Sequence, residues 1–293
     1  MAWTKLAAMA ATAAMLALPV FAQSNNWNKP TEPFHIIDNV YYVGTEGLGA
    51  YLFKTDAGLI LLDGATPEGA AMIEANIAKL GFKVGDVKIL LNSHAHFDHS
   101  GGLAQLKKDT GAQMAAMEGD VSALEGGFYL GSESSKAMGA PPVKVDRVLK
   151  DGDKVTLGGF TLTANLTPGH SRGCTSWGWT AKDGARSYEA LVFCSATVAA
   201  NRITPPLQYE GIVADYRKTF ARAKTMKVDI PLAPHPEFFG LLPKSERAKA
   251  DPKAANPFVD PAAFQPYIAR LEADFERTLK ERTAAAAKPA AGN

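Results

Sequence analysis

The stretch Ser93-His94-Ala95-His96-Phe97-Asp98-His99-Ser100-Gly101-Gly102 places three imidazoles and a carboxylate within six residues, directly after the apolar run 87–91. If this run and the two residues after it form a buried strand, its side chains alternate, so that His94 and His96 leave the strand end on one side. Asp98 and His99 then follow at a turn and point differently. This spacing suits two neighbouring divalent ions rather than one, and zinc favours such nitrogen and oxygen ligands.

Two further histidines stand in similar settings. His170 ends the turn-like segment Thr167-Pro168-Gly169-His170, and His235 lies in Ala233-Pro234-His235-Pro236, each directly after an apolar, strand-like segment. A histidine-rich turn can be merely solvated, and a single histidine is more often a core or surface residue than a ligand. The chain has only six histidines, and their gathering at strand ends favours a metal site.

The pattern His-x-His-x-Asp-His, followed by Pro-Gly-His and by a last histidine after a strand, resembles the metallo-β-lactamase superfamily over about residues 34–283. The resemblance implies an α/β fold, the four-layer αβ/βα sandwich, in a single domain over residues 23–293. It implies two Zn²⁺ ions per chain, the first bound by His94, His96 and His170 and the second by Asp98, His99 and His235. It also implies that a metal-bound hydroxide is the nucleophile and that Asp98 assists in handling the proton.

Asp63 follows the apolar run 59–62 and precedes Gly64. An Asp-Gly pair at a strand end is usually a turn former. In the superfamily the aspartate after this strand commonly hydrogen-bonds near the metal loop, and zinc ligands generally need such orienting partners. Both roles are open for Asp63 from the sequence.

The residues that distinguish the subclasses of the superfamily resemble those of the subclass called B3, which has an all-histidine first site and a serine where another subclass has cysteine. Ser195 stands at that position, and the segment 169–177 is also similar, although Ser171-Arg172 departs from the commoner Thr-Pro. The implied function is zinc-dependent hydrolysis of the amide bond of β-lactam antibiotics, which gives a ring-opened β-amino acid and antibiotic resistance. Ser195 and Thr197 are the implied substrate-binding residues, with Thr197 directed to the β-lactam carboxylate, unless Thr197 only packs at a strand end.

Hydroxyacylglutathione hydrolase-like thioesterases and lactonases share the superfamily motif and are the alternative function. In the thioesterase branch an aspartate bridges the zincs at about the position of Ser195, and its absence here argues against that activity. A secreted zinc-binding protein with a degenerate site is a third interpretation, which the complete set of ligands disfavours.

Residues 1–22 are typical of a cleaved secretory signal peptide, because Lys5 precedes an uncharged apolar run from 6 to 19 and because Val20 and Ala22 stand at the spacing that a signal peptidase reads. The run is shorter than the ~20 residues of a transmembrane helix, although an uncleaved anchor is the alternative. We therefore expect export to the periplasm without a stable membrane anchor. The net charge of +1 gives no basic surface for nucleic acid. We expect a monomer, and the resemblance implies a small-molecule β-lactam substrate as its partner.

Cys174 and Cys194 are the two cysteines of the chain. An even count in an oxidising compartment predicts one disulfide bond between them. Two buried thiols are the alternative. Neither cysteine has the paired spacing of a metal-binding knuckle, and histidines already supply the ligands.

Strand-like and helix-like patterns occur twice along the chain. The first half, about residues 34–143, has strand patterns at 40–43, 50–53, 59–62 and 87–91, and helical patterns at 67–80 and after Gly102. The second half, about residues 144–283, has strand patterns at 147–149, 155–157, 160–166, 175–180, 190–195 and 229–233, and a helical pattern at 209–226. We expect two αβ halves packed sheet against sheet with helices outside, and no separable domains.

Three segments carry weaker patterns. Residues 119–143 are rich in glycine, serine and alanine and predict a mobile loop, in which residues 128–130 (Phe-Tyr-Leu) either close on substrate as a lid or fix the loop to the body. Residues 236–259 predict a loop punctuated by proline and charge. Asp260-Pro261 predicts a helix start with aspartate as the cap, and the helix continues to about 283 before a disordered tail, 284–293. Its apolar stripe, expected in the core, consists of Phe264, Tyr267, Ile268, Leu271 and Phe275.

Overall fold

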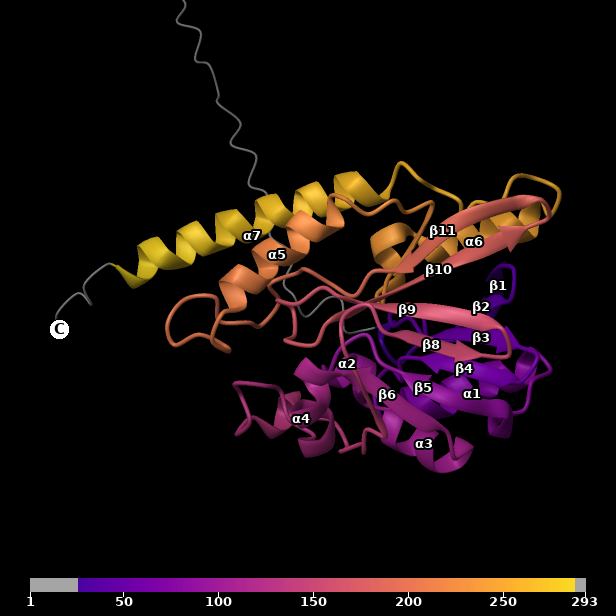
Figure 1. Ribbon diagram of the computed structural model, residues 1–293, viewed down its shortest axis with the longest axis horizontal. Helices are drawn as coiled ribbons and strands as arrows, with labels where there is room; N and C mark the ends of the chain where they lie inside the picture. The colour runs from indigo at the N-terminus through magenta and orange to yellow at the C-terminus, as the bar shows by residue number, and fades with distance from the viewer. Residues whose placement is uncertain (1–25, 288–293) are drawn as a thin grey trace, which may run out of the picture.

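The computed structural model describes residues 26–287, whose strands form two sheets (Figure 1). The predicted signal peptide, 1–22, and most of the predicted tail, 284–293, lie outside the described residues. In the described part, no helix is both long and apolar enough to cross a membrane.

Seven strands form the first sheet, and they lie side by side in chain order. They are β1 (Phe34–Ile37), β2 (Val40–Tyr42), β3 (Tyr51–Thr55), β4 (Gly58–Leu62), β5 (Val87–Leu91), β6 (Gln113–Met117) and β7 (Arg147–Leu149). Strands β1 to β4 pair antiparallel, whereas β4, β5, β6 and β7 run parallel. The carboxyl ends of β4, β5 and β6 therefore meet at one edge of the sheet.

Five strands form the second sheet, in the order β12-β11-β10-β9-β8. They are β8 (Lys154–Leu157), β9 (Phe160–Leu166), β10 (Thr175–Asp183), β11 (Arg186–Val192) and β12 (Ile230–Leu232). All neighbours are antiparallel except β11 and β12, which are parallel. Because β7 pairs with β6, the first sheet extends to Leu149 and includes a strand that lies beyond the expected boundary at 143.

Helices cover the outer faces of both sheets, which gives the four-layer αβ/βα sandwich that the sequence predicts (Figure 1). The helices are α1 (Gly69–Lys79), α2 (Phe97–Ser100), α3 (Leu103–Thr110), α4 (Glu118–Gly126), α5 (Ile212–Ala223), α6 (Leu241–Ala250) and α7 (Phe264–Ala286). One face of the first sheet packs against α1, α3 and α4 through residues such as Leu61, Ile73 and Leu106. Its other face shares a core with the second sheet, including Leu62 and Trp177, and burial of this apolar surface stabilises the sandwich.

The segment 119–143 is not a loop throughout, because α4 occupies its first part. Glu118 and Asp120 lie in the first turn, where acidic side chains are favourable, and Gly127 ends the helix in the left-handed conformation with φ 67°. The glycine-rich composition conceals this helix in the sequence. Tyr129 is buried, so the part of the segment directly after α4 packs onto the body of the protein.

The expected loop 236–259 was also wrong in part, since it contains a 3₁₀ turn, Pro236–Phe239, and then α6. Pro243 is the third residue of α6, where a backbone N–H has no partner inside the helix, so proline does not break it. Pro243, which in the sequence indicated a loop, therefore lies within the first turn of α6.

The last helix, α7, begins at Phe264 rather than at Asp260, and Asp260 is not its cap. The Asp260 carboxylate instead accepts a hydrogen bond from Lys244 Nζ of α6 at 2.9 Å. The helix extends to Ala286, into the predicted tail, and its five-residue apolar stripe is buried as predicted. Strand β11 ends at Val192, earlier than the predicted end at residue 195.

Candidate metal centre

The carboxyl ends of the three parallel strands β4, β5 and β6 assemble one side of a polar site. Asp63 follows β4, the loop with His94 and His96 follows β5, and α4 with Asp120 follows β6. Strand β5 ends at Leu91, earlier than predicted, so His94 and His96 lie in a loop rather than on the strand end. Polar side chains gather here because the strands beneath are buried and nearly all apolar.

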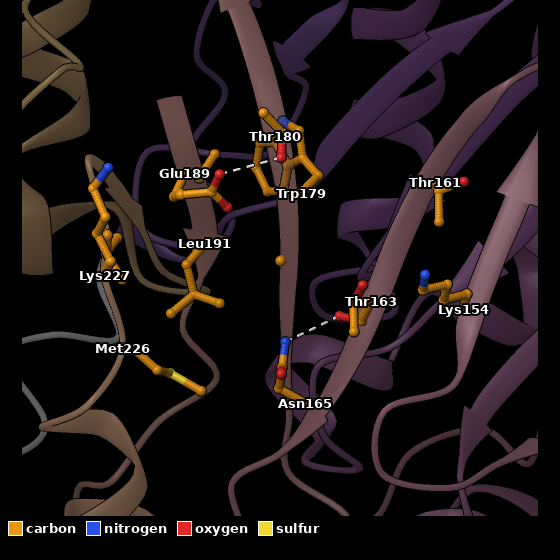
Figure 2. Close-up of a pocket in the computed structure, with 13 residues that line it drawn as sticks. Lys154, Thr161, Thr163, Asn165, Trp179, Thr180, Glu189, Leu191, Met226 and Lys227 are labelled. Atoms are coloured by element: carbon orange, nitrogen blue, oxygen red, sulfur yellow. Dashed lines mark hydrogen bonds between the residues drawn. The ribbon is translucent and has the colours of Figure 1, made fainter. Parts of the chain in front are cut away.

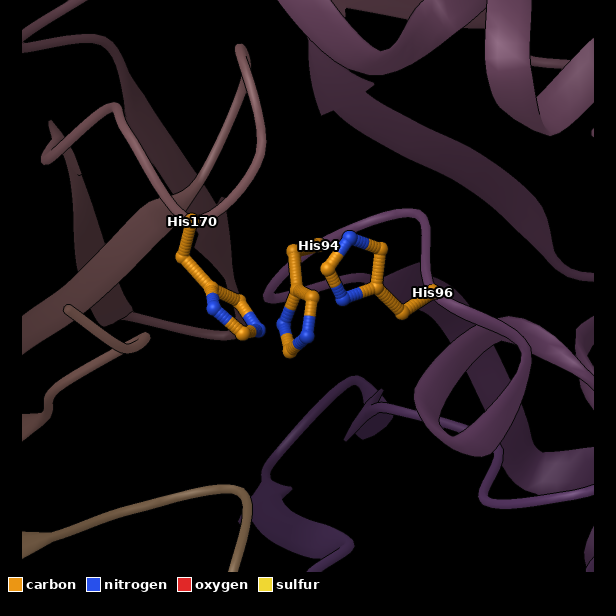
Figure 3. Close-up of side chains that lie close together, drawn as sticks. All are labelled: His94, His96 and His170. Atoms are coloured by element: carbon orange, nitrogen blue, oxygen red, sulfur yellow. The ribbon is translucent and has the colours of Figure 1, made fainter. Parts of the chain in front are cut away.

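His94, His96 and His170 form the first histidine group, with candidate ligand atoms within 4.8 Å of one another. His170 reaches the site from the loop between β9 and β10 of the other sheet. The ring centroids are 4.6 to 4.7 Å apart, and the three imidazoles converge from opposite sides (Figure 3).

Hydrogen bonds select which nitrogen of two of these rings faces the centre. The Thr197 carbonyl is 2.7 Å from His170 Nδ1 and can only accept, so Nδ1 carries the proton and Nε2 keeps its lone pair. His94 Nδ1 contacts Ser93 Oγ at 2.9 Å, whereas His94 Nε2 is buried and has no hydrogen-bond partner within residues 26–287. A buried, unpaired nitrogen is costly unless a cation or a water meets it, and the group fits a metal ion.

Asp98, His99 and His235 form the second group. Asp98 Oδ2 lies 3.1 Å from His99 Nε2 and 3.5 Å from His235 Nε2, and the two nitrogens are 3.2 Å apart. Ligand atoms bound at 2.0–2.1 Å to a tetrahedral zinc are about 3.3 Å from one another. The three atoms thus form one face of a tetrahedron of the size that zinc requires.

Burial keeps most of these imidazoles neutral. It lowers the pKa of His170 to about 4 and that of His235 to about 3, and it lowers the pKa values of His94 and His96 well below the usual range. Neutral imidazole is the form that binds metal, so these four residues need not release a proton at neutral pH.

In the Asp98–His99 pair, the attraction between the two side chains outweighs the effect of burial on both pKa values. Burial alone would raise the pKa of Asp98, but the adjacent His99 and His235 lower it far below its ordinary value. Burial would lower the pKa of His99, but Asp98 outweighs this effect and raises it. The Asp98 carboxylate is therefore ionised at neutral pH and gives the second group a negative charge.

Asp63 is fully buried and orients the loop that carries the first group. Its Oδ1 accepts hydrogen bonds from the Ser93 backbone N–H at 2.6 Å and from Asn92 Nδ2 at 3.0 Å. Burial raises the pKa of this carboxyl to about 6. The contacts match the orienting role among the two roles that the sequence left open.

Three residues at this site were not predicted as neighbours of the histidines from the sequence, although residues 128–130 were considered as a lid or an anchor. Asp120 accepts hydrogen bonds from both histidine loops. The Tyr129 ring stacks on His96 with centroids 4.4 Å apart, and its hydroxyl donates to Asn201 Oδ1 at 2.8 Å. Asp120 and Tyr129 lie in a glycine-rich stretch and Asn201 does not, and only folding brings residues 120, 129 and 201 next to the histidines.

A separate hollow of about 440 Å³ lies over strands β8 to β11 (Figure 2). Its lining includes Lys154, Thr163, Asn165, Glu189 and Lys227. None of the residues that line it belongs to either histidine group. We therefore place the chemistry at the histidines rather than in this hollow.

Solved structures of metallo-β-lactamases match nearly this whole chain. BJP-1, a subclass B3 metallo-β-lactamase of Bradyrhizobium japonicum, is 54% identical with a TM-score of 0.86, over 89% of this chain and 98% of that one. FEZ-1 from Legionella gormanii is 39% identical with a TM-score of 0.82, over 87% of this chain and 98% of that one. The model of the metallo-β-lactamase superfamily matches residues 50–184.

The chain belongs to the metallo-β-lactamase superfamily. Its resemblance to subclass B3, which the sequence indicated through the all-histidine first group and Ser195, is confirmed by this similarity in sequence and fold. The protein is a hydrolase of this superfamily.

Curated relatives in the metallo-β-lactamase superfamily point to a second branch. A hydroxyacylglutathione hydrolase of Rhodospirillum rubrum is 28% identical over 132 residues, which are 45% of this chain and 41% of that protein. Another, of Hyphomonas neptunium, is 30% identical over 108 residues, which are 37% of this chain and 34% of that protein. The chain thus spans about two fifths or less of the length of these relatives.

Ser195 and Thr197, the substrate-binding residues that the superfamily resemblance implies, lie beside the first histidine group. Ser195 is buried, and its Oγ is 3.2 Å from Thr197 Oγ1. Thr197 is half-buried, and its Oγ1 is 3.3 Å from His170 Nδ1. The predicted Cys174–Cys194 disulfide is present, and it ties the His170 loop to the segment that starts at Ser195.

Proposed function

We propose that this protein is a subclass B3 metallo-β-lactamase, which hydrolyses the amide bond of β-lactam antibiotics, gives a ring-opened β-amino acid and confers antibiotic resistance. The observation that supports this most strongly is the pair of complete ligand groups, one with three histidines and one with Asp98. The metallo-β-lactamases of known structure that resemble nearly the whole chain support the same substrate class.

Two zinc ions fit the donors that are present. His94, His96 and His170 would hold one ion, and Asp98, His99 and His235 would hold the other, because nitrogen and carboxylate oxygen ligands in tetrahedral spacing favour zinc. When bound, zinc supplies a water that is acidic near neutral pH and a Lewis acid for a carbonyl oxygen. We expect the second ion to be bound more weakly, although the two groups are similarly buried, with one half-buried member each.

The chain's own residues orient these groups and provide a proton acceptor. The Thr197 carbonyl fixes the ring of His170, and Asp63 fixes the loop before His94. Asp98 stays ionised at neutral pH, so its carboxylate can accept a hydrogen bond from an attacking water and assist in handling its proton. The mature protein acts as a monomer on a small-molecule substrate in this proposal.

The hydroxyacylglutathione hydrolase-like thioesterase or lactonase is the second candidate, because the curated relatives named above carry the thioesterase activity in their names. Their similarity covers less than half of this chain, whereas the β-lactamase structures cover nearly all of it. Ser195 also occupies the position at which the thioesterase branch has an aspartate that bridges the metals.

A substrate panel separates these candidates. The purified chain would be offered a penicillin, a cephalosporin, a carbapenem, a glutathione thioester and a lactone, each with and without a chelator and with zinc added back. We expect hydrolysis of the β-lactams, loss of this activity in chelator and recovery with zinc. Hydrolysis of the thioester without hydrolysis of any β-lactam would replace the proposal with the thioesterase alternative.

Thr197→Val is expected to raise KM more than it lowers kcat. β-Lactams carry a carboxylate beside the ring nitrogen, and residues 195–197 offer hydroxyls but no lysine to meet it. The substitution removes the hydroxyl and spares the Thr197 carbonyl that fixes His170. One hydrogen bond to a charged group contributes ~1.5–3 kcal/mol, so we expect kcat/KM to fall about tenfold to a hundredfold.

The control for this measurement is Thr180→Val, because Thr180 lies on β10 at the separate hollow and outside both histidine groups (Figure 2). It should leave KM unchanged. A KM within twofold of the wild-type value for every β-lactam in Thr197→Val would mean that Thr197 only packs, and Arg172 would be the next residue to test.

Export to the periplasm is the further part of the proposal. We expect the protein recovered from the periplasm to lack residues 1–22, because this segment has the charge, the apolar run and the small residues of a signal peptide. Intact mass measurement checks this directly. Recovery of a chain that still begins at Met1 would overturn it and favour an uncleaved anchor.

A further inference from the structure

The first histidine group is assembled from two loops that belong to different sheets. His94 and His96 follow β5 of the first sheet, whereas His170 lies between β9 and β10 of the second. The distance between the loops must therefore be set by contacts across the sandwich. A ligand group displaced by about 1 Å loses much of its function, so such contacts matter.

The Asp120 carboxylate lies between these two loops. Its Oδ2 accepts a hydrogen bond from the Ala95 backbone N–H at 3.0 Å and another from Ser171 Oγ at 2.7 Å. Its Oδ1 accepts one from the Gly173 backbone N–H at 2.7 Å. Ala95 stands between the two histidines of one loop, and Ser171 follows the histidine of the other, so one side chain joins both.

Close backbone packing holds Asp120 in this place. It lies in the first turn of α4, directly after Gly119. A Cβ at Gly173 would come within 2.5 Å of the Asp120 nitrogen, and one at Gly119 would come within 2.6 Å of the Arg172 carbonyl oxygen. Any larger side chain at either glycine would push α4 away from the His170 loop.

The contacts of Asp120 indicate that it links the two histidine loops rather than only stabilising the start of α4. An acidic residue in a first turn often serves only to stabilise the helix dipole. Asp120, however, is only 3% exposed and directs its oxygens to donors outside α4. A buried carboxylate is costly unless donors meet it, and bonds from N–H and O–H groups to a charged acceptor are the stronger kind.

We propose that Asp120 is the positioning residue of the first metal group, which sets the separation of His94 and His96 from His170. This inference rests on the proposed binding of metal by these histidines. Asp120 itself belongs to neither ligand group. Loss of its hydrogen bonds should therefore lower metal affinity through the displaced histidines.

The test measures zinc dissociation constants by competition with a chromophoric chelator. A His235→Ala background confines binding to the first group, so each variant reports on that group alone. In this background we expect Asp120→Ala to raise the zinc dissociation constant about 10- to 100-fold, the usual effect of removing a partner behind the metal ligands. Cobalt substitution should give an altered visible absorption spectrum, because the ligand geometry changes.

Two milder variants cover the case in which Asp120→Ala does not fold. Asp120→Asn keeps the shape but turns an NH₂ group toward at least one donor, so its affinity should fall between those of the wild type and Asp120→Ala. Ser171→Ala removes one of the three hydrogen bonds and should have the smallest effect. This order of affinities supports the inference.

The matched control is Asn76→Ala, which removes another buried polar side chain. Asn76 lies on α1 and donates to the carbonyls of Val43 and Gly44, away from the histidine loops. It should destabilise the fold without changing the zinc dissociation constant. If Asp120→Asn and Ser171→Ala also lower stability alone and keep zinc affinity within threefold, the inference is overturned. Failure of the His235→Ala parent to bind zinc would instead overturn the proposed function and the inference together.

Discussion

Asp98→Ala is expected to lower kcat/KM for a β-lactam about a thousandfold, a loss of ~4 kcal/mol of transition-state stabilisation. Asp98 is the one anionic member of the second group, and its Oδ2 lies 3.1 and 3.5 Å from the ring nitrogens of His99 and His235. Without it, two imidazoles remain, and they hold a divalent cation poorly. The second ion should therefore be lost while the first remains.

Metal counting and kinetics together check this expectation. Elemental analysis of dialysed Asp98→Ala should find about one zinc per chain, and added zinc should restore little activity because the carboxylate itself is missing. Asp274→Ala, which removes an exposed carboxylate of α7, should retain both ions and full activity. Unchanged turnover of Asp98→Ala with two zincs still bound would contradict the role of Asp98.

Removal of the disulfide is expected to cost on the order of 3 kcal/mol of unfolding free energy. The bond joins Cys174 and Cys194, which are 20 residues apart, and closing a loop of about this length restricts the unfolded chain by ~3 kcal/mol in the chain-entropy model. For a domain of this size the loss lowers Tm by roughly 6–12 °C. The double variant Cys174→Ala/Cys194→Ala and the wild type would be compared by denaturant unfolding without metal.

The reductant dependence of unfolding is the control for this prediction. Wild-type protein unfolded in the presence of a reducing agent should approach the stability of the double variant, whereas the variant itself should not respond. Two titratable thiols in the unreduced, denatured mature protein would contradict the disulfide. Because the bond holds the His170 loop beside Ser195, we also expect the first histidine group of the double variant to bind zinc more weakly.

Local sequence alone determined the second group's two adjacent members and the outline of the fold. Asp98 and His99 are neighbours in the chain, so no folding is needed to predict that they lie together. The strands β4 and β5 and the apolar stripe of α7 can also be predicted from the sequence, because side-chain periodicity follows from backbone geometry. His170 and His235 were recognised by their settings after apolar segments, but their assignment to the two ligand groups came from the family resemblance, since nothing in the intervening sequence fixes their distance from His94.

The tertiary structure decided the features that depend on contacts between distant segments. The pairing of β7 with β6 and the contact between Asp260 and Lys244 both depend on hydrogen bonds between segments that are separated in the chain. Asp120 gives no signal in the sequence beyond an acidic residue near a glycine. Its carboxylate acquires its role only when two sheets bring Ala95 and Ser171 within hydrogen-bonding distance, because a buried charge takes its partners from the packing around it rather than from its neighbours in the chain.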